Sequence, residues 1–205
     1  MTKMFDNETK GVSDMNGIGT NIIETERLIL RRIKKEDYEL VYKNWTSDPK
    51  VSRYVEWNVH KSIDDTKAYI ENKANRYEND EFYFDWIVVL KEINEPIGEI
   101  EAVKVSEAHD LVEMGDCYGS RFWNKGYATE ALKAFMKYMF NEVEVGMIIA
   151  CHISTNPASG RVMQKAGMKY DATLKKYFVD KNSGKRADKV CYSISREEYF
   201  QKSGE

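Results

Sequence analysis

The chain has 205 residues, of which 42% are hydrophobic, and its 31 basic and 34 acidic residues give a net charge of −3. This length and composition are typical of one domain with a hydrophobic core. The balanced charge, without basic runs interleaved with aromatic residues, argues against a nucleic-acid surface. The longest apolar stretches, such as 86–90, have five residues, too few for a helix that spans a membrane.

Residues 1–20 are polar and contain three glycines. We interpret them as a flexible extension before a single domain over residues 21–205. The chain begins without the apolar run of a secretory signal, and we expect a cytoplasmic protein.

The cysteines support this location, because they are odd in number and widely spaced, as expected for reduced thiols: Cys117, Cys151 and Cys191. The three histidines show no spacing typical of metal ligands, so no metal is predicted.

The first half of the chain predicts three strands and two helices. Residues 25–31 alternate as a strand does. A helix is expected over 36–45, ended by Ser47-Asp48-Pro49, and another from Ser62 to about 78, where Ser62 and Asp65 form a variant of the capping box. Residues 82–90 and 97–105 follow as strands joined by a turn.

The second half of the chain predicts strands at 111–118 and 147–152, each followed by a helix. A hairpin is expected from 169–179 and 186–194, because residues 180–184 have a turn composition. Ser195 with Glu198 starts a final short helix. This order predicts a mixed α/β sheet.

The first helix of that half begins after Trp123-Asn124-Lys125-Gly126 and has its apolar residues at helical spacing from Ala128 onward. A helix N-terminus offers unpaired N–H groups and a partial positive charge. Because Gly126 has no side chain, an anion can approach the backbone there. This segment is interpreted either as a phosphate cradle or as an ordinary turn.

The second helix begins at Asn156-Pro157-Ala158-Ser159 and ends near Gly167. Asn156 suits the N-cap position, Pro157 the first helical position and Gly167 the C-terminal stop. Capping preferences alone explain why a helix forms here. They do not explain why this helix follows the segment at 123–126 in this order and at this distance along the chain.

Together the two segments resemble the acetyl-CoA site of the GNAT family of N-acetyltransferases. The family loop reads Gln/Arg-x-x-Gly-x-Gly/Ala, and residues 123–128 read Trp-Asn-Lys-Gly-Tyr-Ala. The Trp form, and the opening Thr25-Glu26-Arg27-Leu28, resemble the RimJ/RimL-like branch of ribosomal-protein acetyltransferases. The resemblance covers residues 25 to about 200. It implies the GNAT fold, in which strands 111–118 and 147–152 are parallel neighbours that splay apart around the cofactor.

The resemblance also implies a set of residues that bind acetyl-CoA, the acetyl donor: Cys117, Tyr118, Trp123, Asn124, Lys125, Gly126, Tyr127, Ala128, Thr129, Asn156, Ser159 and Lys165. Many family members place a tyrosine, the general acid, seven residues after this asparagine. Here that residue is Met163, which cannot donate a proton, so Ser159 is expected to serve the leaving thiolate.

The general base is not fixed by the resemblance. Some family members carry a glutamate four residues before the strand end that binds the thioester, and here that place is Val112. The candidates that remain are Glu101, Glu113, Asp116 and His152, or a water-mediated route without an essential base. Each is also interpretable as an ordinary solvated or paired side chain.

Several alternatives remain for the function. The branch resemblance favours an amine acceptor at a protein N-terminus, whereas aminoglycosides, polyamines or amino acids are other acceptors. Acidic residues between 64 and 85 are interpreted as solvated faces or as an attraction for a cationic amine. A non-catalytic acyl-CoA-binding module and a nucleotide-binding Rossmann-type protein are the competing classes. A monomer or a homodimer is expected.

Overall fold

The computed structural model describes residues 15–181 and 183–203. They form a sheet of eight strands in the order β1-β2-β3-β4-β5-β6-β8-β7. The strands are β1 (Ile23–Glu24), β2 (Leu28–Arg31), β3 (Asp85–Leu90), β4 (Glu95–Ser106), β5 (Leu111–Tyr118), β6 (Met147–Ile153), β7 (Lys169–Val179) and β8 (Arg186–Ser195). Strands β5 and β6 pair in parallel, and the other described pairs are antiparallel. The mixed α/β sheet predicted from the element order is confirmed.

The helices are α1 (Tyr38–Val41), α2 (Pro49–Ser52), α3 (Ile63–Asn79), α4 (Tyr127–Asn141), α5 (Pro157–Ala166) and α6 (Arg196–Ser203). Short 3-10 turns lie at Lys35–Asp37, Glu107–His109 and Ser120–Phe122. Helix α3 has the expected capping box, because Asp65 N–H donates to Ser62 and the Asp65 carboxylate accepts from Ser62 N–H. None of the described helices is long and apolar enough to span a bilayer.

The helix expected over 36–45 is irregular. A 3-10 turn leads into α1, and a π-helical turn follows at Tyr42–Thr46. The Ser47 hydroxyl donates to the Tyr42 carbonyl at 2.6 Å, and side-chain bonds of this kind compete with the regular helical ladder. The wider turn buries Trp45, whose exposed fraction is 0%.

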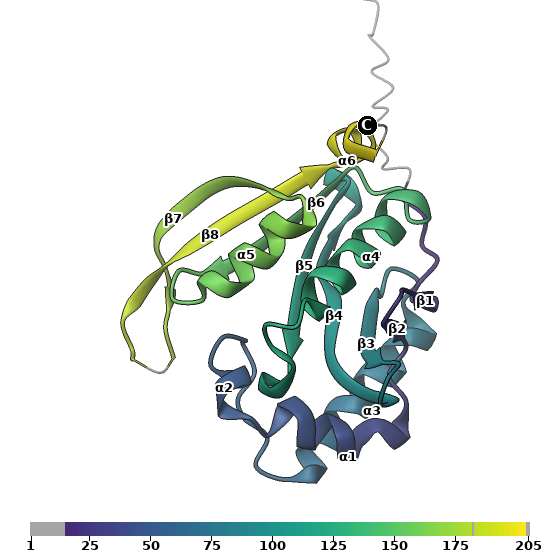
Figure 1. Ribbon diagram of the computed structural model, residues 1–205, viewed down its shortest axis with the longest axis vertical. Coiled ribbons are helices and arrows are strands. Elements are labelled where there is room, and N and C mark those ends of the chain that lie inside the picture. Colours follow the sequence, from purple (N-terminus) through teal and green to yellow (C-terminus); the bar gives the residue numbers. More distant parts are fainter. Residues whose placement is uncertain (1–14, 182, 204–205) are drawn as a thin grey trace, which may run out of the picture.

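Helices cover both faces of the sheet. Helices α4 and α5 lie side by side in front of it in Figure 1, and α4 packs on the larger apolar core with residues such as Phe135 and Met139. Helices α1 and α3 belong to a second core that includes Ile70 and Ile87. Because both faces are covered, every residue of β3 is buried, which explains its nearly continuous apolar sequence.

The two parallel strands diverge part-way along their length. Their pairing ends at Met114 and Ala150, although β5 continues to Tyr118 and β6 to Ile153. Beyond that point β5 stays paired with β4, and β6 stays paired with β8. In Figure 1 the part of the sheet formed by β6, β8 and β7 leans away from the rest. The predicted pair of parallel neighbours that splay apart is therefore confirmed.

Residues 15–20 pack on the domain, although the sequence predicts a flexible extension there. Met15 is 8% exposed and Thr20 is 2% exposed. The Thr20 hydroxyl donates to the Tyr83 carbonyl at 3.0 Å and accepts from Asp85 N–H at 2.9 Å. The flexible extension expected over residues 1–20 therefore does not include residues 15–20, which gain both burial and hydrogen bonds. Residues 1–14 lie outside the described residues.

Candidate active site

The N-terminus of α4 forms an open backbone surface. Gly126 has φ +84°, a left-handed conformation that is strained for residues with a side chain, and α4 begins directly after it. A Cβ added at Gly126 would have only the Arg27 guanidinium within 4 Å, at 3.4 Å. The N–H groups of the first helical turn have no intrahelical acceptor. The surface therefore fits an anionic group that needs close backbone approach.

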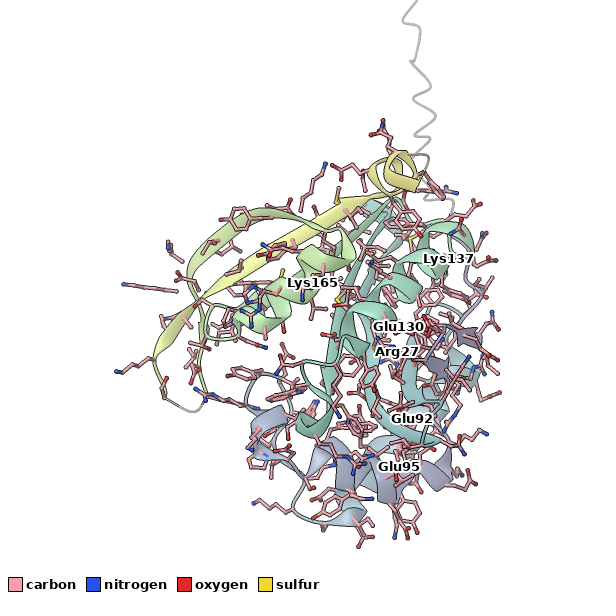
Figure 2. The ribbon with its side chains drawn as sticks, in the orientation of Figure 1. Arg27, Glu92, Glu95, Glu130, Lys137 and Lys165 are labelled. Carbon is pink, nitrogen blue, oxygen red and sulfur yellow. The ribbon has the colours of Figure 1, made fainter. Side chains whose placement is uncertain are left out.

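Two side chains of the turn between β1 and β2 hold this helix end in place. Glu130, in the first turn of α4, accepts hydrogen bonds from the Thr25 hydroxyl at 2.6 Å and from Arg27 Nε at 2.7 Å. Arg27 also donates to the Lys125 carbonyl at 3.1 Å, and its guanidinium lies 4.7 Å from the Tyr127 ring centroid. Figure 2 shows Arg27 and Glu130 next to each other at this end of α4. The turn between β1 and β2 thus braces the loop before α4.

The loop is also tied to the end of β5. The Trp123 indole donates to the Tyr118 carbonyl at 2.7 Å, while Trp123 itself is 38% exposed. Asn124 has φ +61°, so two left-handed residues flank Lys125. Lys125 is exposed, whereas the side chain of Tyr127 is buried in the core and can contribute only its backbone to a ligand.

Helix α5 begins close to the splayed end of β6. Pro157 occupies the first helical position, but the Asn156 side chain does not cap the helix. It donates instead to Ser159 Oγ at 2.9 Å. Gly167, with φ +105°, ends the helix as expected. A Cβ at Gly160 would lie 2.6 Å from His152 Nε2, so a side chain there would prevent the close packing of α5 on β6.

The end of β5 presents different side chains to the two faces of the sheet. Asp116 shares a face with Val112 and Met114, which belong to the core under α4. Burial raises the pKa of Asp116 to about 7, and its carboxylate has no side-chain partner among the described residues. Cys117 lies on the opposite face, where burial raises the pKa of its thiol well above the usual value. The Tyr118 hydroxyl is buried without a partner in the described part of the chain.

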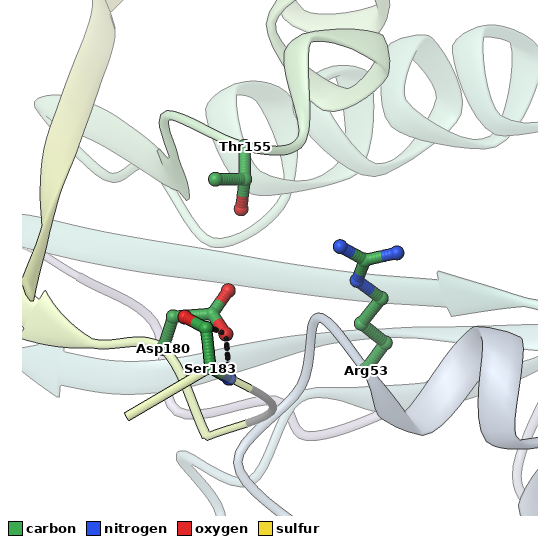
Figure 3. Close-up of a pocket in the computed structure, with 4 residues that line it drawn as sticks. All are labelled: Arg53, Thr155, Asp180 and Ser183. Atoms are coloured by element: carbon green, nitrogen blue, oxygen red, sulfur yellow. Dashed lines mark hydrogen bonds between the residues drawn. The ribbon is translucent and has the colours of Figure 1, made fainter. Parts of the chain in front are cut away.

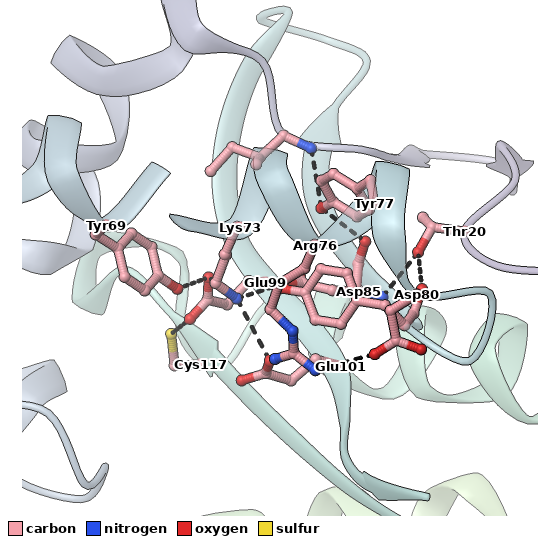
Figure 4. Close-up of polar contacts among 12 residues, drawn as sticks. Thr20, Tyr69, Lys73, Arg76, Tyr77, Asp80, Asp85, Glu99, Glu101 and Cys117 are labelled. Carbon is pink, nitrogen blue, oxygen red and sulfur yellow. Dashed lines mark hydrogen bonds and ion pairs between the residues drawn. The ribbon is translucent and has the colours of Figure 1, made fainter. Parts of the chain in front are cut away.

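A buried cluster of charges lies on the face of the sheet that α3 covers (Figure 4). Lys73 Nζ, from α3, is 2.5 Å from an Asp85 carboxylate oxygen and 3.4 Å from oxygens of both Glu99 and Glu101. The Tyr69 hydroxyl donates to Glu99 at 2.5 Å, and the Tyr83 hydroxyl donates to Asp85. These bonds compensate the two innermost carboxylates for their burial.

Glu101 is the most exposed carboxylate of this cluster, with a side chain 27% exposed. Burial raises the pKa of Glu101 to about 7, with Lys73 opposing the shift and Asp85 and Glu99 adding to it. Glu101 lies directly opposite Gly115 in the β4–β5 register. Gly115 is the first residue of β5 beyond the last pair with β6. A carboxylate that titrates near neutrality therefore stands beside the point where the sheet opens.

Comparisons with known proteins identify the family to which the chain belongs. Residues 27–169 match the model of the acetyltransferase (GNAT) domain. The chain belongs to the GNAT family. It is therefore an acetyltransferase, and its mixed α/β sheet matches the fold of a solved GNAT structure.

Individual relatives agree with this assignment. An uncharacterized N-acetyltransferase, YnaD of Bacillus subtilis, is 34% identical over 86% of this chain and 98% of its own length. A GNAT-family acetyltransferase from Bacillus anthracis has a TM-score of 0.75 at 31% identity, over 87% of this chain and all of its own. RimL, a ribosomal-protein α-N-acetyltransferase solved in complex with coenzyme A, has the same fold, with a TM-score of 0.75 at 14% identity over 85% of this chain and 98% of its own.

The GNAT position that often carries the tyrosine acid is filled here by a core residue. Met163 is 4% exposed and packs in the main hydrophobic core. Lys165, by contrast, is exposed in the last turn of α5, the helix that packs against α4 (Figure 2). Its proposed contact with the cofactor stays a prediction.

The candidate bases are separated by the structure. Glu113 shares the face of Glu101, but its carboxylate is paired with Lys189 of β8 at 3.1 Å. Asp116 points to the other face, toward α4 and α5, and His152 stacks on Tyr192 beneath α5. Of these residues, Glu101 combines an accessible carboxylate with a place beside the opening of the sheet.

Sequence motifs do not single out Lys73, Asp85 and Glu99 as partners of Glu101. The signal that exists is weak: Tyr69, Lys73 and Tyr77 are spaced by four residues and share one face of α3. Arg27 is likewise not singled out as a brace of the cradle, although it lies in the segment that resembles the RimJ/RimL-like branch. Among the described residues no group of His, Cys, Asp or Glu side chains is arranged to hold a metal ion.

A pocket of about 440 Å³ lies between α2, the loop after β6 and the turn between β7 and β8. Figure 3 shows the residues that line it, which are Arg53, Thr155, Asp180 and Ser183. The Lys181 ammonium donates to the Trp57 carbonyl at 2.6 Å, so the hairpin turn contacts the loop after α2.

Proposed function

We propose that this protein transfers an acetyl group from acetyl-CoA to a primary amine, with Glu101 as the base and Ser159 beside the leaving sulfur. The observation that carries the proposal is the position of Glu101 opposite Gly115, where β5 and β6 separate. This brings an accessible, near-neutral carboxylate to the gap that the cofactor occupies in the resembled family.

The chain's residues fit the cofactor at both helix ends. The open backbone at Gly126, Tyr127, Ala128 and Thr129 suits the diphosphate, and Lys125 adds a positive charge. The edge of β5 beyond Met114 has lost its β6 partner and offers backbone groups to the pantetheine arm and the thioester oxygen. When bound, acetyl-CoA supplies an activated acyl group as a thioester. The coenzyme A complex of RimL supports this choice of cofactor.

Proton transfer then follows from the positions of two side chains. An amine acceptor arrives mostly protonated, because its pKa is about 8 for an α-amine and about 10 for a lysine-like amine. Glu101 takes that proton, and a base with a pKa of about 7 suits the task at neutral pH. The C–N bond forms as the C–S bond breaks. The nitrogen loses its second proton as the amide forms, and that proton goes to the leaving thiolate. Ser159 accepts a hydrogen bond from Asn156, so its own hydroxyl can donate a hydrogen bond to that sulfur.

For the acceptor we propose the α-amine of a protein N-terminus. The resemblance to the RimJ/RimL-like branch supports this choice, as does the similarity in fold to RimL. The pocket of about 440 Å³ beside the hairpin turn favours a second class, small amines such as amino acids, polyamines or aminoglycosides, because its volume is in the range of small-molecule sites.

Free-thiol release from acetyl-CoA tests the proposal. The wild-type protein is assayed against N-terminal peptides, polyamines, aminoglycosides and amino acids, beside the Glu101→Gln variant, which keeps the shape of the side chain. We expect release with one acceptor class and a loss of at least about a hundredfold in the variant. Tight acetyl-CoA binding without release across the panel would instead favour a non-catalytic acyl-CoA-binding module.

A further inference from the structure

Lys73 is a buried lysine surrounded by three carboxylates. Its side chain is 8% exposed, and Nζ lies within 3.4 Å of oxygens of Asp85, Glu99 and Glu101. Burial opposes the ammonium, but Glu99, Asp85 and Glu101 outweigh it and raise the pKa of Lys73 well above its usual value. Lys73 therefore stays charged throughout the pH range in which enzymes work.

The three carboxylates are not equivalent. Asp85 and Glu99 have side chains 2% and 6% exposed, and each receives a second hydrogen bond, from Tyr83 and Tyr69 respectively. Glu101 is 27% exposed, and Lys73 is the donor that it contacts among the described side chains. Glu101 is thus the member of the cluster that an incoming amine can reach and that exchanges its proton with least rearrangement.

The surroundings of Glu101 come from four elements. Helix α3 contributes the Lys73 ammonium, β3 contributes Asp85 directly opposite Glu101, and β4 contributes Glu99 two residues earlier. From β5, the charge of Glu113 is balanced by Lys189, and the Cys117 thiol contacts Glu99 at 3.5 Å. One positive charge therefore opposes two unbalanced negative charges around Glu101.

We propose that Lys73 is a positioning residue, which holds Glu101 ionised at the open end of the cluster and thereby sets the pH below which acetyl transfer is lost. The inference rests on the proposed function, because Glu101 acts there as the base. Glu101 accepts a proton from the acceptor's nitrogen, and Lys73 keeps its own proton throughout. Asp85 and Glu99 act in the opposite sense, since their negative charges favour the protonated form of Glu101.

This opposition gives a test in which two substitutions have effects of opposite sign. Lys73→Met removes the positive charge and should raise the pKa of Glu101 by at least about one unit, the lower end of the range for a close charge partner. Glu99→Gln removes a negative charge and should lower the pKa, while its amide oxygen still accepts the bond from Tyr69. Lys73→Arg keeps the charge and serves as the matched control. A purely structural role of Lys73 would not produce shifts of opposite sign.

The titration is measured on the ligand-free protein by carbon-13 NMR of labelled glutamate carboxylates, with Glu101→Gln identifying the signal. We expect a wild-type midpoint near neutrality, an upward shift in Lys73→Met, a downward shift in Glu99→Gln and little change in Lys73→Arg. The same midpoint in Lys73→Met as in the wild type overturns the proposal. If Lys73→Met does not fold, Lys73→Gln, which removes the same charge but keeps a polar end, is measured instead, and an unchanged midpoint there overturns the proposal.

Kinetics separate this inference from the proposed function. The acid limb of the pH profile of kcat/KM should move with the NMR midpoint in each variant, and a limb that stays in place overturns the catalytic part of the proposal. NMR shifts of the expected sign in a protein that releases no thiol with any acceptor would refute the proposed function, while the electrostatic role of Lys73 would stand.

Discussion

Replacement of Gly126 tests the cofactor cradle most directly. Gly126 has φ +84°, and a Cβ there would have the Arg27 guanidinium, at 3.4 Å, as its nearest neighbour outside the adjacent residues. Gly126→Ala therefore fits the available space, and its cost is the left-handed backbone, about 1–2 kcal/mol of folding stability. Gly126→Glu carries the same backbone cost and adds a carboxylate at the end of α4.

The added charge decides the size of the effect on binding. A carboxylate about 5 Å from one phosphate charge, at an effective dielectric constant of about 20, is repelled by about 3 kcal/mol. Each 1.4 kcal/mol corresponds to about a tenfold change in affinity, so Gly126→Glu should weaken acetyl-CoA binding by at least about a hundredfold. Gly126→Ala should change the affinity much less, because the space in front of the helix stays open.

Isothermal titration calorimetry with acetyl-CoA measures both affinities, and thermal unfolding shows whether each variant is folded. A folded Gly126→Glu protein that binds acetyl-CoA as tightly as the wild type would refute the cradle. Equal losses in the alanine and glutamate variants would show that backbone geometry, and not bulk or charge, controls binding.

Three further substitutions test other parts of the site and fold. Ser159→Ala should lower kcat more than it raises KM in the thiol-release assay if the hydroxyl serves the leaving sulfur, whereas equal effects would indicate a positioning role. Asp116→Asn should raise the thermal stability at pH 8 but not at pH 4. The raised pKa of Asp116 means that the folded state favours its protonated form, so the wild-type protein loses stability as the pH rises toward 7. A gain in stability that is independent of pH would contradict this. Gly98→Ala should lower the free energy of unfolding in urea by about 1–3 kcal/mol, because the Cβ of the alanine would overlap the Cys117 carbonyl oxygen. An unchanged unfolding midpoint would show that β4 and β5 can separate there.

The elements around the cofactor site could be predicted because their signals are local. Gly126 and Pro157 mark the starts of α4 and α5, and Gly167 marks the end of α5, each through a backbone preference of the residue itself. Strand β6 follows from an apolar run, whereas β5 mixes apolar residues with Glu113 and Asp116. The order of the elements was sufficient to predict the mixed sheet, and the resemblance carried by the segments at 123–131 and 156–168 predicted the family and the splayed pair of strands.

Three features were predicted less well from local patterns. Asn156 has the composition of an N-cap, yet its side chain turns to Ser159. The helix expected over 36–45 contains a π-helical turn that buries Trp45, and residues 15–20 pack on the domain because Thr20 meets Tyr83 and Asp85. The contacts of Thr20 join segments distant in sequence, whereas Asn156 and the helix over 36–45 differ from the prediction through side-chain bonds within five residues.

The sequence by itself was sufficient to predict the GNAT family, through two short motifs that resemble it, and the starts of α4 and α5, through the conformations open to glycine and proline. Only the tertiary structure separated the three candidate carboxylates by their surroundings. Glu101, Glu113 and Asp116 are similar as residues in a strand, but the register of β4 against β5 puts Glu101 at the opening, while Lys189 pairs with Glu113 and Asp116 faces α4. Lys73, more than twenty residues away in sequence, reaches Glu101 only because α3 covers that face of the sheet.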